Sequence, residues 1–340
     1  MRAMKALSLA LTASVALTAA LPALAQDMKD PFRDPALESL KGKKIAYLPI
    51  SIGFDLAQAW GGVVKQQSQV YGMEFSSQDP NWSTDAMAQG FTALLAEKPD
   101  VIVTQNPDMQ SLARLMKQAN SQGIVVVQLN MAGAVQTDAV VAPDFIGMGE
   151  QIAQKVVEKC GKGTDTSHKV ALVQGVLTGG VSFYQVQGIE KVFKENPEIQ
   201  LVSSQAADWD ASKARAITET VLQQHPDVCA VIDVWDGQGV GTGAAIKQAG
   251  LSDKVFFITS GGGAQSMCDM LKDGTFSAAY NYDAVGMGRD AWTAIMVALQ
   301  NKQGGGAIKT QMYSPYRYMT AADVKDGTCF NAEDYAKILR

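Results

Sequence analysis

The sequence predicts an α/β protein with two similar domains, each a doubly wound parallel sheet. Short runs rich in β-branched residues alternate with longer runs in which apolar residues recur every three or four positions. The strand runs are apolar on consecutive residues, which indicates that helices cover both faces of each sheet. The alternation occurs twice along 340 residues, a length that suits two cores better than one.

The predicted elements fall into two groups, one on each side of a composition break near Ala142-Pro143. The predicted strands are Lys44–Pro49, Val101–Gln105, Ile124–Leu129, Val170–Gln174, Val228–Val234 and Val255–Thr259. The predicted helices between them include Ala86–Glu97, Met109–Asn120, Ile146–Lys159 and Ala211–Gln224. Because no Pro- or Ser-rich linker joins the two groups, we expect the two domains to abut around a cleft.

Residues 1–25 have the composition of a cleavable secretory signal peptide. Arg2 and Lys5 precede an uncharged run over residues 6–21, and Ala23-Leu24-Ala25 supplies small residues at the cleavage site. The run is short for a bilayer span, so a retained membrane anchor is the less favoured alternative. We therefore expect a periplasmic protein, free of a membrane anchor after cleavage.

Charge and residue content exclude several classes of function. The formal net charge of -5 leaves no surplus of Lys and Arg for nucleic-acid phosphates. Two histidines and four cysteines without a CxxC pair argue against a zinc site. The chain has no GxSxG elbow, and its glycine-rich run at 236–243 does not have the GxGxxG spacing of a dinucleotide site. We expect no enzyme, no catalytic residues, no cofactor and no metal.

The cysteines allow three pairings in an oxidising compartment. Cys160 precedes the other three by a long interval, and Cys229 opens an apolar run, where we interpret it as a buried small hydrophobic residue. Cys268 and Cys329 lie in more polar segments, which favours a disulfide bond between these two.

Candidate binding residues follow the strands, because ligands of open parallel sheets bind outside the carboxyl ends of the strands. The residues at these places are amides, carboxylates, aromatic rings and glycines, and almost none is basic. An anionic ligand would normally require an arginine or a lysine. Indole rings, carboxylates and amides suit a neutral ligand that carries hydroxyl groups.

The order and spacing of four segments carry a family resemblance. They are KIAYLPISIGFDLAQAWGGVVKQQSQVYGM, KPDVIVTQNPDMQSLARLMKQANSQGIVVVQLN, QAADWDASKARAITETVLQQHPDVCAVIDVWDG and VFFITSGGGAQSMCDMLKDGTFSAAYNYD. With them the chain resembles the periplasmic substrate-binding proteins of sugar ABC transporters, in the ribose- and galactose-binding branch of the type I fold. The resemblance implies two lobes, three crossovers and closure by a hinge. It places the N-terminal lobe at 26–142 plus 283–312 and the C-terminal lobe at 143–282 plus 313–340.

The resemblance also implies which residues contact the ligand. By position they are Phe54, Asp55, Asn130, Gln185, Trp209, Trp235, Asp236, Gly262 and Tyr282. The arginine and aspartate pairs that hold a pentose or hexose in the family are largely replaced here, while indole and phenol rings widen the aromatic surface. Phe54 could alternatively belong to the core, and Asp55 and Asp236 could cap helices.

These features predict the substrate-binding protein of an ABC importer, a monomer that captures a small neutral sugar or polyol in its interdomain cleft. It would deliver this ligand to a membrane permease with a cytoplasmic ATPase. Two alternatives stay open. The protein could be a ligand receptor for a chemoreceptor or sensor kinase, or the binding protein for a cationic, aromatic or nucleoside-like small molecule.

Overall fold

The computed structural model describes residues 30–301 and 304–340. Contacts within the chain define one unit that ends at Ser39 and a second from Leu40 to Arg340. Helix α2 (Arg33–Leu40) begins in the first unit, and the elements described below all belong to the second. The expected signal peptide at 1–25 lies outside the described residues. Across the described ranges, no helix is both long enough and apolar enough to span a membrane.

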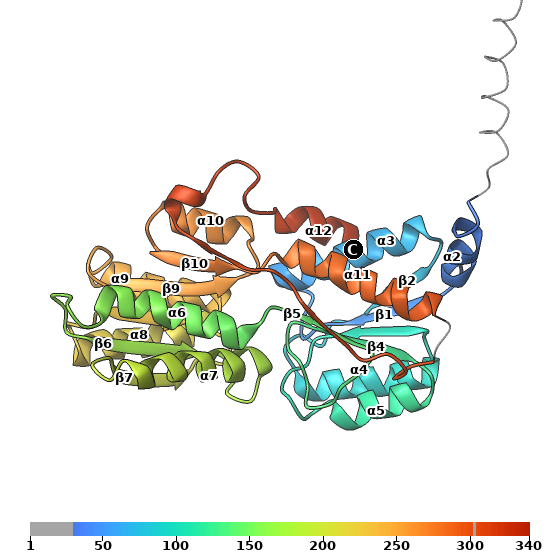
Figure 1. Cartoon of the computed structure of the whole chain (residues 1–340), viewed down its shortest axis with the longest axis horizontal. Helices are drawn as coiled ribbons and strands as arrows, with labels where there is room; N and C mark the ends of the chain where they lie inside the picture. Colours follow the sequence, from blue (N-terminus) through green and yellow to red (C-terminus); the bar gives the residue numbers. More distant parts are fainter. Residues whose placement is uncertain (1–29, 302–303) are drawn as a thin grey trace, which may run out of the picture. The chain divides into compact units, whose positions relative to one another are not determined.

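The first of two six-stranded sheets is parallel throughout and has the order β11-β5-β4-β3-β1-β2. Its strands are β1 (Lys44–Leu48), β2 (Glu74–Ser77), β3 (Val101–Thr104), β4 (Val125–Leu129), β5 (Ala139–Ala142) and β11 (Thr310–Tyr313). Figure 1 shows helices on both of its faces, with α3 and α11 on one side and α4 and α5 on the other. The bounds are α3 (Asp55–Val70), α4 (Thr84–Glu97), α5 (Ala113–Ser121) and α11 (Ala284–Gln300).

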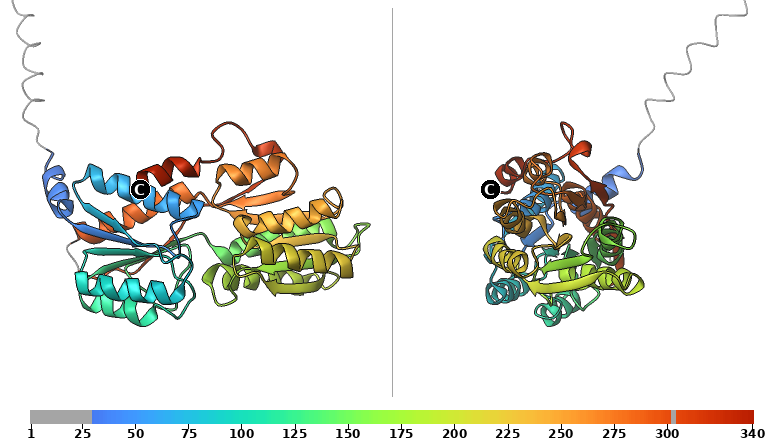
Figure 2. Two further views of the ribbon diagram at one scale, coloured as in Figure 1. Left: turned by 180° about the vertical axis from the view of Figure 1, so that it is seen from behind. Right: turned by 90° about the vertical axis from the view of Figure 1, so that its left-hand side faces the viewer.

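The second sheet has the order β12-β10-β9-β8-β6-β7, and only its edge strand β12 runs antiparallel to its neighbour. Its strands are β6 (Lys169–Gln174), β7 (Gln200–Ala206), β8 (Ala230–Asp233), β9 (Phe256–Gly261), β10 (Ala278–Asn281) and β12 (Arg317–Met319). Its helices pack in pairs, α6 with α7 and α8 with α9, so that this sheet also carries helices on both faces (Figure 2). They are α6 (Phe145–Cys160), α7 (Gly180–Glu195), α8 (Ala211–Gln224), α9 (Asp236–Gln248) and the shorter α10 (Gln265–Lys272). The predicted fold class, two parallel-sheet α/β domains, is confirmed.

The central strands form the cores and follow the predicted pattern. Strands β3, β4 and β8 are buried along their whole length, because helices cover them on both faces. Their Val and Ile side chains each contribute roughly 1.5–3 kcal/mol when removed from water. The edge strands β2 and β7 are polar and mostly exposed, which is why the apolar pattern did not reveal them.

The C-terminal tail is shared between the two domains, which differs from the expected boundary at 313–340. The segment before Phe330 stays with the second sheet, since the amide of Phe330 donates to the carbonyl of Gly263 over 3.0 Å. Helix α12 (Ala332–Leu339) instead packs on α3, where Lys65 Nζ lies 3.0 Å from the carbonyl oxygen of Leu339. Gly62 permits this approach, because a Cβ there would come within 3.0 Å of Tyr335.

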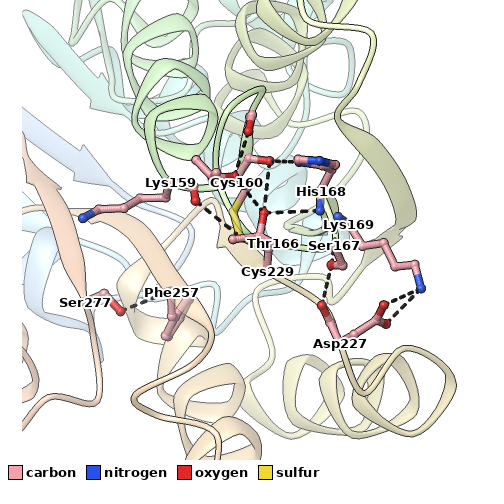
Figure 3. The surroundings of a disulfide bond; sticks show 12 residues. Lys159, Cys160, Thr166, Ser167, His168, Lys169, Asp227, Cys229, Phe257 and Ser277 are labelled. Carbon is pink, nitrogen blue, oxygen red and sulfur yellow. Dashed lines mark hydrogen bonds and ion pairs between the residues drawn. A yellow bond between two sulfur atoms is a disulfide. The ribbon is translucent and has the colours of Figure 1, made fainter.

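Two disulfide bonds close loops within the second domain. The expected bond between Cys268 and Cys329 is present. Cys229 is buried, as expected, but its interpretation as a simple hydrophobic residue is wrong, because it is bonded to Cys160 at the end of α6. Figure 3 shows why the two meet: the turn after α6 brings His168 Nδ1 to 2.6 Å from the carbonyl oxygen of Cys160, beside the start of β6. Cys229 then lies next to this turn because its amide donates to the carbonyl of Lys169.

Candidate functional site

A cavity of about 20 Å³ lies between loops that follow strands of both sheets. The side chains that line it nearly fill the space in this arrangement, since a single water molecule needs roughly 10–15 Å³. None of the described residues that line it is charged. They are Ile50, Phe54, Leu56, Trp82, Gln105, Asn130, Met131, Val181, Trp209, Trp235 and Tyr282.

Four aromatic side chains, which we call the aromatic cage, form the wall of this cavity: Phe54, Trp82, Trp209 and Trp235. The ring of Phe54 lies with its centre 5.1 Å from that of Trp82 and 5.9 Å from that of Trp235. The ring centres of Trp209 and Trp235 are 6.1 Å apart and nearly perpendicular. Phe54 and Trp82 come from the first domain and the other two from the second. The cage therefore exists only when the domains are together.

Several polar atoms of the cavity have no hydrogen-bond partner among the described residues. They are the indole nitrogens of Trp209 and Trp235 and the side-chain oxygen of Asn130, and all three atoms are buried. Buried polar groups are normally paired, so atoms of this kind in a cavity indicate places where a ligand binds. Two donors and one acceptor suit the hydroxyl groups of a small molecule.

The ring of Trp235 is positioned by a buried aspartate. Trp235 precedes α9 in an extended conformation, and its amide donates to Oδ1 of Asp233 over 3.2 Å. The same carboxyl group accepts hydrogen bonds from Gln238 and Thr242, each over 2.7 Å. Burial raises the pKa of Asp233 to about 7, although these hydrogen bonds oppose the shift. Asp233 thereby fixes the turn between β8 and α9.

Asn130 owes its place to the turn after β4. Its backbone is left-handed, with φ of 59°, a conformation that asparagine tolerates better than most residues. The backbone N–H of Asn130 donates to the carbonyl of Val141 over 2.8 Å, which leaves the side chain free to face the cavity. Below it, Asn106 donates to Gln128 and to the carbonyl of Met131, both over 2.8 Å, and so holds the loop that follows.

Asp55 and Asp236 lie behind the cage and do not line the cavity. Burial, followed by the neighbouring charge of Asp55, raises the pKa of Asp236 well above its usual value. Burial also raises the pKa of Asp55, whose carboxylate accepts from the amide of Leu56 over 2.7 Å. Tyr282 shares this environment, because burial and then the charges of Asp236 and Asp55 raise the pKa of its hydroxyl. One oxygen of Asp236 is buried without a partner among the described atoms.

The structure distributes the predicted site residues over three places. Phe54, Asn130, Trp209, Trp235 and Tyr282 line the cavity, and Asp55 and Asp236 stand behind it.

Gln185 and Gly262 lie elsewhere. Gln185 is fully buried and joins α7 to the sheet, since its Nε2 donates to the carbonyl of Val234 over 3.2 Å. Gly262 lies where the domains meet, and a Cβ on it would overlap the side chain of Leu56.

Trp82 is the main residue that sequence reasoning missed, and an internal repeat could have revealed it. Ser-Ser-Gln occurs at 76–78 and again at 203–205, with a tryptophan four positions after each glutamine. Trp82 and Trp209 have the same left-handed backbone, with φ of 65° and 66°. Each is followed by a residue that caps a helix, Ser83 for α4 and Asp210 for α8. The two tryptophans thus occupy equivalent places in the two domains.

Direct contacts join the domains at the margins of the cavity. The amide of Met109 donates to the carbonyl of Thr178 over 3.1 Å. Met109 is therefore in a loop, and the helix predicted from this residue begins only at Ala113. On the same side, a Cβ on Gly180 would lie 3.1 Å from the carbonyl oxygen of Ala132. These contacts describe a closed arrangement.

Comparison with known proteins identifies relatives of this chain. Residues 45–303 match the family model described as periplasmic binding protein domain. The chain is 26% identical to the ribose import binding protein RbsB of Bacillus subtilis (strain 168) over 218 residues, which are 63% of this chain and 68% of that protein. It is 30% identical to the D-allose-binding periplasmic protein of Escherichia coli (strain K12) over 134 residues, 39% of this chain and 42% of that protein.

Solved structures share the fold. An ABC transporter solute binding protein from Agrobacterium vitis with bound D-fucose superimposes with a TM-score of 0.74 at 21% identity, covering 84% of this chain and 97% of that one. At this identity the likeness concerns the fold alone. The family model, in contrast, spans most of the sequence, and the chain therefore belongs to the family of periplasmic binding protein domains.

Proposed function

We propose that this protein is the substrate-binding component of an ABC importer and that it captures a small neutral sugar or polyol. The observation that carries the proposal is the uncharged cavity whose aromatic walls come from both domains and whose buried polar atoms lack partners. The printed names of the relatives, ribose import binding protein and D-allose-binding periplasmic protein, support a sugar as ligand.

Ligand capture in this proposal follows from the chemistry of the wall. The C–H faces of a sugar or polyol would pack on the indole rings, which present large apolar surfaces. Its hydroxyl groups would accept from Nε1 of Trp209 and Trp235 and donate to Oδ1 of Asn130. A ligand that contacts both domains binds the closed arrangement more tightly than the open one and so shifts the population toward closure. The closed surface would then be presented to the permease and its ATPase.

The proposal also covers the cellular location of the protein, its oligomeric state and the bounds of its lobes. We infer a periplasmic monomer, released by removal of residues 1–25, with no catalytic function. We infer lobes at 26–142 plus 283–312 and at 143–282 plus the tail, except for α12, which packs with the first lobe. The chain would bend at its crossings between the sheets, where Asp283 has a left-handed backbone with φ of 47°.

A cationic small molecule is a second candidate ligand. It is favoured by the aromatic cage, because the faces of aromatic rings attract cations such as quaternary ammonium groups. The absence of charge among the described lining residues is equally compatible with a neutral ligand.

A thermal-shift screen of the mature protein distinguishes these candidates. We would test pentoses, hexoses and polyols against choline, betaine and related amines, and confirm each hit by isothermal titration calorimetry. A ligand at a hundred times its Kd stabilises the folded state by ~2.7 kcal/mol, which raises the melting temperature by several degrees. We expect this shift with at least one sugar or polyol. A response confined to the amines would favour the second candidate, and no response to sugars or polyols would contradict the proposal.

A further inference from the structure

A second hollow, which we call the outer groove, adjoins the cavity. Its volume is about 500 Å³. It shares Ile50, Trp82 and Trp209 with the cavity, so the two spaces meet along the tryptophan pair. The remainder of its lining is more polar and includes Thr84, Asp108 and Asp208.

The tryptophans between the two spaces are held by unusual backbone geometry. In each domain two successive residues that are not glycine are left-handed: Asn81 and Trp82 have φ of 48° and 65°, and Asp208 and Trp209 have φ of 53° and 66°. Such conformations are energetically unfavourable for residues other than glycine, persist only where the surrounding structure fixes them, and cluster at functional sites. This unfavourable backbone conformation occurs at equivalent positions of both domains. Trp82 keeps 44% of its surface exposed, so it can contact a ligand in the groove as well as in the cavity.

The carboxylates of the outer groove are fixed acceptors. Oδ1 of Asp108 accepts from the amides of Gln110 and Ser111 over 2.7 and 2.8 Å. Asp208 forms an ion pair with Lys213 over 2.9 Å. A carboxylate has about four acceptor sites, so each retains sites for further donors. Thr84 adds a hydroxyl group for which no hydrogen bond to the described residues is found.

Resting on the proposed function, we propose that the outer groove is a second subsite and that the ligand has two hydroxylated units, as in a glycoside. The first unit occupies the cavity, where the rings of the aromatic cage offer surfaces on which a single sugar ring can stack. The second unit lies past Trp82 and Trp209, where its hydroxyl groups donate to Asp108 and Asp208. A polar groove that continues from an aromatic cavity across the same pair of rings suits a ligand that stacks on both sides of them.

The test compares single units with their conjugates. The probes are D-ribose, D-xylose, D-glucose, D-galactose and xylitol, each alone and joined to a second glucosyl or galactosyl unit. We would measure Kd by titration calorimetry on the mature wild-type protein. The inference requires at least one conjugate to bind at least tenfold more tightly than its single unit. It is overturned if single units bind and no conjugate binds more tightly. If neither series binds, the proposed function fails, and the inference fails with it.

Variants of residues that line the outer groove test whether the tighter binding of the conjugate arises there. Thr84→Trp adds bulk to the groove and should remove the tenfold advantage of the conjugate while the Kd of the single unit changes by less than twofold. Asp108→Asn removes one charge without adding volume and should reduce the advantage at least threefold. Thr293→Trp, at an exposed threonine of α11 outside both hollows, is the matched control. If both groove variants keep the full advantage with a wild-type melting temperature, the second subsite is excluded.

Discussion

Trp235 combines three features that rarely coincide in one side chain. It lines the cavity, its ring contacts those of Phe54 and Trp82 from the other domain, and its indole nitrogen is buried without a protein partner. Residues of this kind dominate binding energetics in other interfaces. The side chain therefore matters both for the ligand and for the meeting of the domains.

We predict that Trp235→Ala weakens binding of the ligand found by the screen at least tenfold, since it removes a stacking surface and a donor at once. Titration calorimetry measures the change. The matched control is Trp292→Phe, which alters a buried indole that stacks on Tyr71 outside the cavity. An unchanged Kd for Trp235→Ala would mean that the ligand binds elsewhere.

Asp233 makes the stability of the protein depend on pH. Burial raises its pKa in the folded state to about 7, above the usual value of 3.8, so the folded state binds this proton more tightly than the unfolded state. The stability that protonation supplies is fully present below about pH 4 and is lost as the pH rises toward 7, by up to ~4 kcal/mol.

Asp233→Asn should flatten this dependence. We predict that the free energy of unfolding of the variant falls less than that of wild type between pH 4 and 7, as measured by urea denaturation at each pH. Asp55 and Asp236 contribute in the same direction to both proteins. Besides burial and the charge of Asp55, the charge of Asp233 raises the pKa of Asp236, so the difference between the two curves reports Asp233 together with its effect on Asp236. Asp253→Asn, at an exposed position, is the control. Parallel curves for wild type and Asp233→Asn would contradict the assignment.

At the scale of elements, the disulfide between Cys160 and Cys229 ties the end of α6 to the residue before β8. It closes a loop with a sequence separation of 69 residues. In the chain-entropy description such a bond destabilises the unfolded state by about 4 kcal/mol. We predict that Cys160→Ser with Cys229→Ser lowers the free energy of unfolding by roughly 2–4 kcal/mol in denaturant titrations. A loss below 0.5 kcal/mol would show that the bond constrains little.

The sequence predicted the buried strands that have long apolar runs and did not reveal strands that are exposed, or short and rich in alanine. Strand β4 is apolar at every position except Gln128, so the apolar run that marks it can be recognised in the sequence without knowledge of the fold. Strand β2 alternates poorly because its side chains are mostly exposed, and β5 is only four residues long and half alanine. The disulfide of Cys229 was not predicted because a buried cysteine in a disulfide bond and a buried small residue have the same apolar neighbours in the sequence.

The site residues also divide into those that the sequence could predict and those that it could not. Phe54, Asn130 and Trp235 follow strands and were accessible to the rule that ligands bind at strand ends. Trp82 follows the edge strand β2, which the pattern did not reveal, so only the Ser-Ser-Gln repeat carried the information. Gly262 was assigned by position in the family, but its role here depends on Leu56, a contact between distant segments that no local pattern encodes.

At the scale of the whole molecule, we expect closure of the domains to depend on Gly262. A side chain here would collide with Leu56 and would come 2.8 Å from Cβ of Ala284. We predict that Gly262→Leu holds the domains apart, weakens ligand binding at least tenfold and removes the ligand-induced decrease in radius of gyration seen by small-angle X-ray scattering. Gly262→Ala, which adds only a Cβ, should weaken binding less than Gly262→Leu does. Wild-type affinity in Gly262→Leu would show that closure tolerates a side chain there.

The divided tail has a consequence for how the molecule opens. Phe330 is anchored to Gly263 of the second domain, directly beside the disulfide of Cys329, while Asn331 caps the helix that packs on α3 of the first. The Cα atoms of adjacent residues lie less than 4 Å apart, so the connection between Phe330 and Asn331 cannot lengthen. We therefore expect opening to be a rotation about an axis near Phe330, because translation at this edge would break the hydrogen bond of Phe330 or the packing of α12 on α3. Reduction of the Cys268–Cys329 disulfide would free the segment before Phe330 and allow a wider rotation of the domains.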